Sequence, residues 1–590
     1  MQTTSRSTTG LPRPRRPAST VISAISASPV RRAAALLCGA ACLAGLEPAA
    51  AAGPPDAGSV LQQLRPPPAP APREEAPAVL PAAPEAAPVP ASTGEAAARV
   101  RVAQIRISGA SVFAEAELLA VVQDAIGREL DFAGLEELAA RLSRFYRQHG
   151  YTVARAYLPP QDIQDGVVQI AVVEGRYSAI TVKPQKPQDG LPAPLPLAAL
   201  APGELVNDAA LERSLLLAAD VPGIAVRSTL QPGASVGTSE LVVEVEPGPA
   251  VTGLLEADNF GSRATGSTRV GASVYFNNPA GLGDLLSLRA LTAGRGLNYG
   301  RLAWQLPVGG YGTRVGAAVS AMDYRLGREF ESLEAHGTAS IVTLFAAHPL
   351  LRSRARNLNV QASAEHKRLR DRIDLVGSVD DKQLSLLNLG VSGDARDDWG
   401  GGGAWSLSAT YTRGQLDMDS AAARAIDEAT VRSAGGFGKL GLQAVRQQSV
   451  GKATLLVAYT GQWGSKNLDS SEKLPLGGAG AVRAYPQGEA PSDRASLLTL
   501  ELQYPLGEGW HLAGFFDAAV GYANTDPLPA GAGTGAANRR SLSGAGLGLN
   551  WAGAQGWSAR IFYARKLHGG PATAEPDRGE RVWLQLAKSF

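Results

Sequence analysis

Apolar and polar residues alternate in short runs along the second half of the chain, from Val251 to Phe590, and Gly-rich turns separate the runs. Strict alternation predicts β-strands with one apolar face. Sixteen runs can be marked, and their spacing leaves room for strands of about 9–11 residues, the length that crosses a membrane. The runs begin near Val251, Thr268, Asp284, Asn298, Thr313, Gly337, Arg356, Lys382, Gly402, Gly435, Lys452, Arg494, Trp510, Arg539, Trp557 and Arg581.

The connections between the predicted strands are short on one side and longer on the other. Short turns such as SVGK and AGAQGW fall on the first side. The opposite side includes Met418 to Ala434, Asn467 to Asp493, Asn524 to Asn538 and His568 to Glu580. Bacterial outer-membrane barrels show this asymmetry, with short periplasmic turns, and closure of the barrel pairs every backbone group within the lipid. We therefore expect a mainly β protein with a 16-stranded antiparallel transmembrane β-barrel over residues 250–590.

Alternation also assigns the two faces of each predicted strand. Leucines and Tyr504 share one face of the run that begins at Arg494, and the next run has the same pattern. The polar side of these two runs, which we assign to the lumen, holds Thr499, Glu501, Gln503, His511, Phe515 and Asp517. A charge at mid-strand is costly on the lipid side of a barrel, so Asp517 is expected to point into the lumen.

Two small α+β modules are predicted ahead of the barrel, over residues 99–177 and 178–249. The first reads strand, helix, helix, strand, strand, and its second helix follows Asp131 and ends near Gly150. Apolar residues of that helix recur at helical spacing, which predicts one buried face. The second module repeats the order more loosely around a clear helix from Asp208 to Ala219.

The N-terminal segment has the features of a leader. Residues 1–52 combine a basic start, an apolar stretch from Ala33 to Leu46 and small residues up to Ala52, as in a secretory signal peptide. Within residues 53–65, the sequence from Asp56 to Arg65 predicts a short helix, and residues 66–98 form a Pro/Ala-rich linker. A short helix on a long tether suggests a removable plug, and a disordered mature N-terminus is the alternative.

Composition argues against several functional classes. Lys and Arg total 56 against 54 Asp and Glu, so the net charge indicates no nucleic-acid partner. Both cysteines, Cys38 and Cys42, lie in the predicted leader, and the six histidines lack metal-ligand spacing. No P-loop sequence occurs, and the G-x-S-x-G match from Gly233 to Gly237 lies between two strands instead of at a strand-to-helix turn. The sequence predicts no enzyme, no catalytic residue, no cofactor and no metal site.

The stretch from Pro475 to Ala490, PLGGAGAVRAYPQGEA, is the most distinctive sequence in a predicted loop. Its glycines permit a tightly packed backbone. By composition alone it is an exposed hairpin loop with a solvated arginine. The residues that we single out as a loop motif are Gly477, Gly478, Val482, Arg483 and Tyr485.

This stretch resembles the VRG[FY] loop of outer-membrane two-partner secretion transporters of the haemolysin/haemagglutinin secretion-activation type. The segment AGFFDAAVG, which contains Asp517, resembles the barrel strand of that family that carries an aspartate. The resemblance implies that Arg483 folds inward and pairs with Asp517, whereas an ordinary lumen carboxylate is the alternative. Ala484 stands where the family usually has glycine, so a loop that needs positive φ at this position would be strained.

The resemblance covers nearly all of the chain after the leader. It identifies the two modules as polypeptide-transport-associated (POTRA) domains in the periplasm and the barrel as embedded in outer-membrane lipid. It implies type V secretion of an unfolded exoprotein cargo, with or without activation of that cargo, and no nucleotide hydrolysis. It further implies barrel-assembly machinery and periplasmic chaperones as partners, and Phe590 resembles the terminal aromatic residue that directs such assembly.

Two other functions stay open at this point. An outer-membrane protein assembly barrel of the same superfamily would also have POTRA modules and the loop, but it would normally have more modules. A general solute porin would explain the barrel but not residues 100–248.

Overall fold

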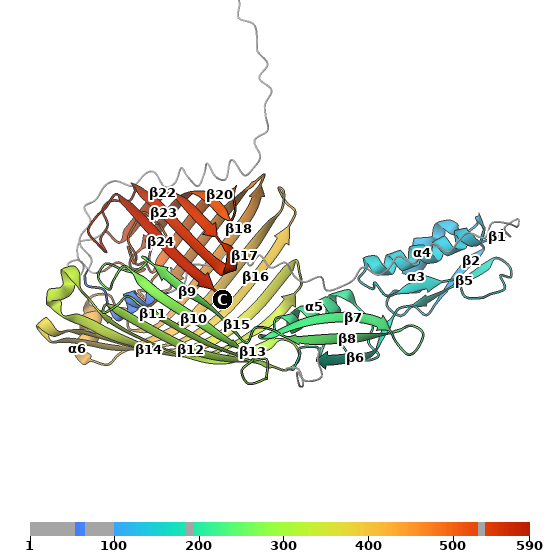
Figure 1. Cartoon of the computed structure of the whole chain (residues 1–590), viewed down its shortest axis with the longest axis horizontal. Coiled ribbons are helices and arrows are strands. Elements are labelled where there is room, and N and C mark those ends of the chain that lie inside the picture. The colour runs from blue at the N-terminus through green and yellow to red at the C-terminus, as the bar shows by residue number, and fades with distance from the viewer. Residues whose placement is uncertain (1–52, 65–98, 185–193, 529–536) are drawn as a thin grey trace, which may run out of the picture. The chain divides into compact units, whose positions relative to one another are not determined.

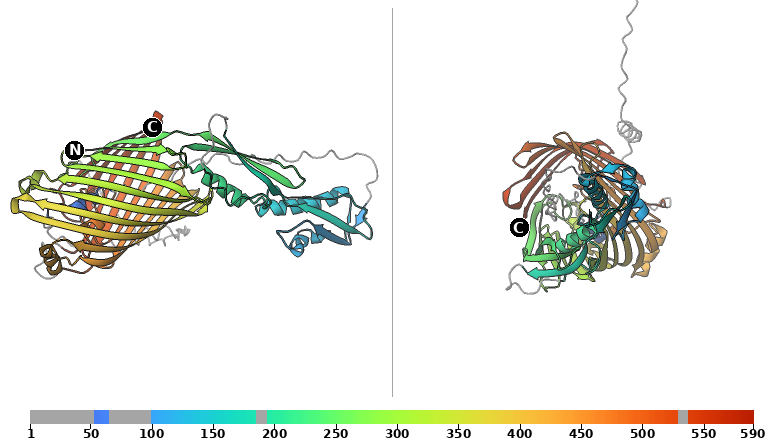
Figure 2. Two further views of the ribbon diagram at one scale, coloured as in Figure 1. Left: turned by 90° about the horizontal axis from the view of Figure 1, so that it is seen from below. Right: turned by 90° about the vertical axis from the view of Figure 1, so that its right-hand side faces the viewer.

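The computed structural model describes residues 53–64, 99–184, 194–528 and 537–590 (Figure 1). The predicted signal peptide and the Pro/Ala-rich linker lie outside these residues. Sixteen strands, β9 to β24, pair in chain order, each antiparallel to the next, and β24 returns to pair with β9. The predicted 16-stranded antiparallel barrel is therefore confirmed (Figure 2).

The barrel strands begin within four residues of the predicted starts, and β16 shows the largest difference, at Ser378 instead of Lys382. The first four residues of β16, SVDD, are mostly polar and do not show the alternation that predicts a strand. Alternation is required only where one face of the strand meets lipid. The strands are β9 (Val251–Asp258), β10 (Arg269–Asn277), β11 (Leu285–Thr292), β12 (Leu297–Val308), β13 (Thr313–Arg325), β14 (Ala335–Arg352), β15 (Arg356–Ile373), β16 (Ser378–Asp397), β17 (Gly403–Met418), β18 (Gly435–Val450), β19 (Ala453–Gly464), β20 (Arg494–Gly507), β21 (Trp510–Tyr522), β22 (Arg539–Ala552), β23 (Trp557–His568) and β24 (Glu580–Ser589).

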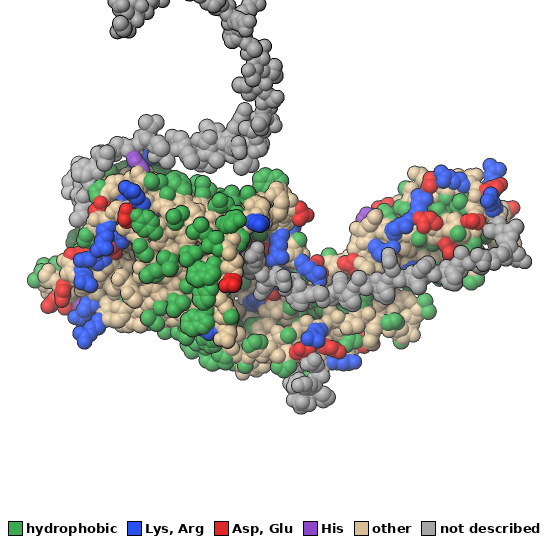
Figure 3. Space-filling view, turned by 45° about the horizontal axis from the view of Figure 1, so that its top comes forward, with side chains coloured by type: hydrophobic (Ala, Val, Ile, Leu, Met, Phe, Trp, Pro, Cys, Tyr) green, Lys and Arg blue, Asp and Glu red, His purple; other side chains and the backbone are tan. Residues whose placement is uncertain are grey.

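The two faces of the barrel wall differ in the way that alternation predicts. On β20 and β21, the outward Leu502 and Leu512 are 48% and 44% exposed, whereas the inward Glu501 and Asp517 are 5% and 1% exposed. Figure 3 shows hydrophobic side chains over much of the barrel wall in this view, with Lys and Arg side chains gathered along one rim. The apolar face suits lipid, and the polar face lines the lumen.

The connections divide as predicted into tight turns and long loops. Two residues separate β18 from β19 on the periplasmic side, whereas residues 419–434, which include helix α6 (Ala421–Ala429), link β17 to β18 on the outer side. The connection between β19 and β20 is also long, and it folds back into the lumen.

The first module, over residues 100–173, packs two helices on one face of a three-stranded sheet. Its elements are β1 (Val100–Arg101), β2 (Gln104–Ser108), α3 (Glu115–Val122), η1 (Gln123–Ala125), β3 (Glu129–Leu130), α4 (Phe132–Gln148), β4 (Arg155–Tyr157) and β5 (Val167–Val173). The sheet order is β2-β5-β4, and β1 pairs separately with β3. Two strands, β1 and β2, therefore stand where the sequence predicted one. Asp131 caps α4 through the Gly134 N–H, and Leu138 and Leu142 lie on its buried face.

The second module has a three-stranded sheet in the order β6-β8-β7 and one described helix. Its elements are β6 (Arg176–Pro184), α5 (Asp208–Ala219), β7 (Ile224–Pro232) and β8 (Thr238–Pro247). Leu211 and Leu215 of α5 pack with Val243 of β8 in the core of this module. Asn207 caps the helix by accepting a hydrogen bond from the Ala210 N–H.

A short helix, α2 (Ala57–Gln62), lies within the ring of barrel strands (Figure 1). Asp56 and Ser59 form a capping box at its start. Ala57 and Val60 are fully buried against inward residues of the barrel. No helix among the described residues is long and apolar enough to cross a membrane.

Candidate functional site

The connection from Asn467 to Asp493, here called the lumen loop, occupies the interior of the barrel. It begins near the outer end of β19, and most of its residues are buried. We divide it into an outer limb, residues 467–474, and a tip, residues 475–490. Leu474 pairs with Ser492 across the base of the tip, so the two ends of the tip leave the wall together.

Two glycines of the predicted motif fix the shape of the tip. A Cβ on Gly477 would lie 2.7 Å from the Cβ of Glu489 and 2.8 Å from that of Tyr485, so any side chain here would force the turn apart. Gly478 has φ +132°, a conformation that favours glycine. Val482 donates from its N–H to the Leu476 carbonyl at 3.0 Å and closes the turn.

Arg483 points from the tip to the barrel wall and is buried among carboxylates. Its Nε and Nη2 donate to the two oxygens of Asp517, each at 2.9 Å, and its backbone N–H donates to the same carboxylate at 3.1 Å. Its Nη1 donates to Glu501 on β20 at 2.6 Å. Thr499 donates to the Asp517 carboxylate at 3.0 Å. The fork of the guanidinium is thus matched by two inward carboxylates on neighbouring strands.

Aromatic rings complete the surroundings of Arg483. The ring centroid of Phe515 lies 3.4 Å from the guanidinium carbon, and that of Phe562 lies 5.0 Å away. Trp583 on β24 donates from Nε1 to the Arg483 carbonyl at 2.7 Å. These rings exclude water and strengthen the charge interactions of the guanidinium.

The remaining motif residues hold the tip against the last strands. Tyr485 is fully buried, and its hydroxyl donates to the carbonyls of His568 and Gly570 at 3.2 and 3.0 Å. Ala484, which departs from the family pattern, does not have positive φ, so the strain considered above is absent. Its Cβ instead occupies the space that Gly544 leaves, because a Cβ on Gly544 would lie 2.4 Å from it.

The structure brings together some of the residues predicted to face the lumen and separates others. Gln503 donates to the second oxygen of the Glu501 carboxylate at 2.8 Å and so supports the Arg483 cluster. His511 lies six residues before Asp517 on β21, about 20 Å along the strand, and has no part in the cluster. The pairing of Glu501 with Arg483 was missed, although alternation had placed Glu501 inward on a run next to that of Asp517.

A second cluster, which the sequence reading missed, anchors the outer limb. Glu472 is buried and lies between Lys367 of β15 and Lys439 of β18, with nitrogen–oxygen distances of 2.7 and 2.5 Å. Asp469 pairs with Lys382 of β16 at 2.8 Å. Here the loop supplies the carboxylates and the wall supplies the cations, which is the reverse of the arrangement at the tip. Alternation along their strands places these lysines on the inward face, and this was the one sequence feature that could have indicated a contact with the loop.

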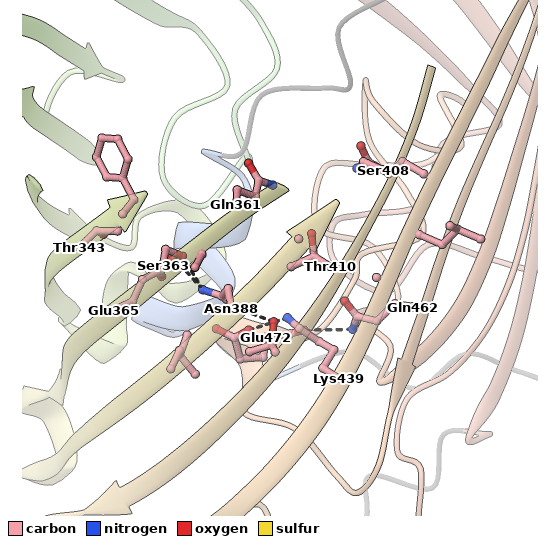
Figure 4. Close-up of a pocket in the computed structure, with 18 of the residues that line it drawn as sticks. Thr343, Gln361, Ser363, Glu365, Asn388, Ser408, Thr410, Lys439, Gln462 and Glu472 are labelled. Atoms are coloured by element: carbon pink, nitrogen blue, oxygen red, sulfur yellow. Dashed lines mark hydrogen bonds and ion pairs between the residues drawn. The ribbon is translucent and has the colours of Figure 1, made fainter. Parts of the chain in front are cut away.

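A polar cavity of about 620 Å³ adjoins the outer limb (Figure 4). Strands β14 to β19 and Arg301 of β12 supply its wall, and Glu472 and Leu474 of the loop lie at one end. Among its lining residues are Gln361, Ser363, Asn388, Ser408, Thr410 and Gln443. Within the described part of the chain, no group of His, Cys, Asp and Glu side chains is arranged to hold a metal ion.

The fold and the lumen site together define a class. A closed barrel with an apolar outer face, two α+β modules before it and a loop folded into its lumen is characteristic of outer-membrane barrels that handle polypeptides. The chain belongs to the family described as haemolysin secretion/activation protein ShlB/FhaC/HecB, whose profile matches residues 237–551. A ShlB-type POTRA domain also matches residues 100–175.

Individual relatives agree with this assignment. The heme/hemopexin transporter protein HuxB of Haemophilus influenzae is 26% identical over 483 residues, which are 80% of this chain and 84% of HuxB. The outer membrane transporter CdiB of Escherichia coli is 25% identical over 433 residues, 69% of each chain. The solved structure of CdiB from Escherichia coli has the same fold, with a TM-score of 0.66 at 22% identity over 85% of this chain and 92% of that chain.

The protein is therefore an outer-membrane transporter of the two-partner secretion type, with a barrel in the outer membrane and POTRA modules in the periplasm. Its barrel serves as the pore through which a partner protein is secreted. The members of the family are transporters.

Proposed function

We propose that the protein secretes an exoprotein of haemolysin or haemagglutinin type in unfolded form, and that the Arg483 cluster holds the lumen loop in one position during this work. The observation that carries the proposal is the buried contact of Arg483 with Asp517 and Glu501. A buried charge whose partners are all satisfied is stable, whereas loss of one partner leaves an uncompensated charge, so the contact fixes the loop.

Cargo is first received by the POTRA modules in this proposal. An extended segment can add to the open edge of a small sheet through main-chain hydrogen bonds. In the first module β5 is the central strand of its sheet, so β4 and β2 supply the open edges. The strands β6 and β7 supply the edges in the second, and each has nine residues.

The proposal also includes a driving force for transport and two kinds of accessory protein. The sequence contains no P-loop, and we infer that folding of the cargo outside the cell makes transport directional. Periplasmic chaperones keep the cargo unfolded, and the barrel-assembly machinery inserts the transporter itself.

The test is to delete residues 100–177 and to express the variant together with the partner exoprotein. We expect secretion of that exoprotein to be lost while a heat-modifiable barrel remains in the outer membrane. Normal secretion would refute cargo reception by the first module. If other outer-membrane proteins were depleted instead, the chain would act as an assembly barrel.

A further inference from the structure

The polar cavity beside the outer limb has the chemistry of a surface for an extended polypeptide. Five of its lining side chains, Gln361, Ser363, Asn388, Ser408 and Thr410, carry no charge and can donate and accept hydrogen bonds. Charged side chains, among them Arg301 and Glu365, and apolar ones such as Phe345 complete the lining. The uncharged polar groups replace water around the N–H and C=O groups of any sequence. They give weak, repeated contacts, which a moving chain requires because it must bind and then leave.

Glu472 closes this cavity at its outer end. Its side chain is 2% exposed, and its carboxylate contacts Lys367 at 2.7 Å and Lys439 at 2.5 Å, from strands three apart in the barrel order. Gln462 donates to the Glu472 carbonyl at 3.0 Å. One loop residue therefore links several strands of the wall across the end of the cavity (Figure 4).

The closure is separate from the attachment of the tip. Arg483 contacts β20 and β21, whereas Glu472 contacts β15 and β18. The signs of the charges are also reversed between the two clusters, so neither half of the loop can take the position of the other. Asp469 of the outer limb also pairs with Lys382 of β16, which is likewise separate from the strands that hold Arg483. The outer limb can therefore leave the wall, once its own ion pairs break, while Arg483 keeps the tip in place.

We propose that the polar cavity is the passage by which an extended polypeptide moves past the lumen loop, and that the contact of Glu472 with Lys367 and Lys439 is the latch that closes the outer end of this passage. The proposal rests on the role of the barrel as a secretion pore, but its tests below do not depend on the identity of the cargo.

The latch can be tested by thiol labelling on intact cells. Ser408 faces the cavity, and its partner Gln443 on β18 lies four residues to the periplasmic side of Lys439. In a chain with both leader cysteines replaced by alanine, Ser408→Cys is treated from outside with a polyethylene-glycol maleimide too large for porins. We expect slow labelling in this parent and labelling several-fold faster when Glu472→Gln is added.

A control variant and a second latch variant accompany the labelling test. Glu428→Gln, at an exposed position on α6, should leave the rate unchanged. Lys439→Gln removes the wall partner of Glu472 and should also accelerate labelling. It serves as the test if Glu472→Gln does not assemble into the membrane. Rapid labelling of the parent, or no acceleration in assembled latch variants, would overturn the latch.

The passage is tested in planar bilayers with a synthetic Gly/Ser/Thr/Asn peptide as the probe. In the Glu472→Gln background, the peptide should cause brief blocks of the single-channel current. Ser408→Trp should reduce their frequency several-fold. Ser287→Trp, at an inward position of β11 outside the cavity lining, should not. Equal effects of the two tryptophans, or no effect of Ser408→Trp, would show that the peptide does not follow this wall.

Discussion

Arg483 is the residue on which the lumen site depends. A guanidinium at 5% exposure has lost most of its hydration, and the structure compensates with Asp517, Glu501 and the ring of Phe515. A lysine could not reproduce this arrangement, because its single nitrogen cannot reach both carboxylates with fixed geometry. The site therefore requires the guanidinium of arginine, and a positive charge alone is not sufficient.

Removal of either main partner should impair secretion without loss of the barrel. Loss of one member of a buried pair costs about 3–5 kcal/mol, so Arg483→Ala and Asp517→Ala should each reduce secretion by more than about tenfold. Secretion of the partner protein is measured, and heat-modifiability of the barrel is the control.

A double-mutant cycle shows whether the two residues act as a pair. The double alanine variant should be no worse than the worse single variant, and the charge swap Arg483→Asp with Asp517→Arg should restore part of the activity. Because the swap would place a second carboxylate near Glu501, it should work better when Glu501→Gln is added. Strictly additive effects without rescue would rule out the pair.

Glu174 is a buried carboxylate of the first POTRA module and has a structural role. It accepts hydrogen bonds from the N–H groups of Ser111 and Val112 at 2.6 and 2.8 Å and from the Tyr146 hydroxyl at 2.9 Å. Burial raises the pKa of Glu174, but the hydrogen bonds from Ser111, Val112 and Tyr146 together lower it further, so the pKa lies below its usual value. A carboxyl with a lowered pKa contributes stability above its unfolded pKa of about 4.3 and loses that contribution as the pH falls through the folded pKa.

Glu174→Gln should therefore destabilise this module by about 1–3 kcal/mol at neutral pH, because an amide cannot accept the same set of hydrogen bonds. Hydrogen exchange of the full-length protein should become faster in residues 104–148. The difference from the parent should shrink as the pH falls below about 4. Glu136→Gln, at an exposed position of α4, is the control, and equal exchange in the two variants would contradict the prediction.

At the scale of elements, α2 and the lumen loop form one layer inside the barrel. Asp56 accepts a hydrogen bond from Ser470 at 2.6 Å and pairs with Lys382 at 3.1 Å, and Lys382 also pairs with Asp469 of the loop. Gly58 packs so closely against the outer limb that a Cβ would lie 2.6 Å from the Ser471 backbone nitrogen. The helix is too short to be stable alone, so these contacts hold it.

This arrangement predicts that α2 obstructs the pore. Deletion of residues 56–65 should raise the single-channel conductance in planar bilayers and leave secretion largely intact. Lys382→Met removes the cation that Asp56 and Asp469 share. It should also raise the conductance, but by less than the deletion does. An unchanged conductance after the deletion would mean that the segment does not act as a plug.

At the scale of the molecule, the barrel is closed by its shortest strand pairing. Five register pairs join β24 to β9, against eight between β9 and β10. Phe590 extends this seam, because its N–H and carbonyl bond to Gly253 at 3.0 and 2.8 Å. A Cβ on Gly253 would lie 2.4 Å from the Phe590 ring, so the absence of a side chain there leaves room for the ring.

Phe590→Ala should therefore lower the amount of assembled barrel, since the ring over Gly253 is lost where pairing is shortest. The heat-modifiable band in the outer-membrane fraction measures this amount. Phe590→Tyr keeps the ring and should assemble normally. If Phe590→Ala reached the parent level, the ring would have no part in closure.

The sequence alone determined the barrel, because lipid on one side and lumen on the other impose a two-residue period on every membrane strand. The same period placed Glu501 and Asp517 on the inner face, and the resemblance to a family indicated the partner of Arg483. Local signals such as Asp131 before α4 also located that helix. Each of these features is encoded within a few neighbouring residues.

Only the tertiary structure decided which inward residues meet. Lys367, Lys439 and Glu472 are far apart in the chain, and a lysine at an inward position has the same local pattern whether it is solvated or buried. The fit of Ala484 against Gly544 and the docking of α2 on the outer limb likewise depend on how a long loop folds back. Those contacts arise from closure of the barrel, which brings distant strands together at fixed distances, and no periodicity along the chain records them.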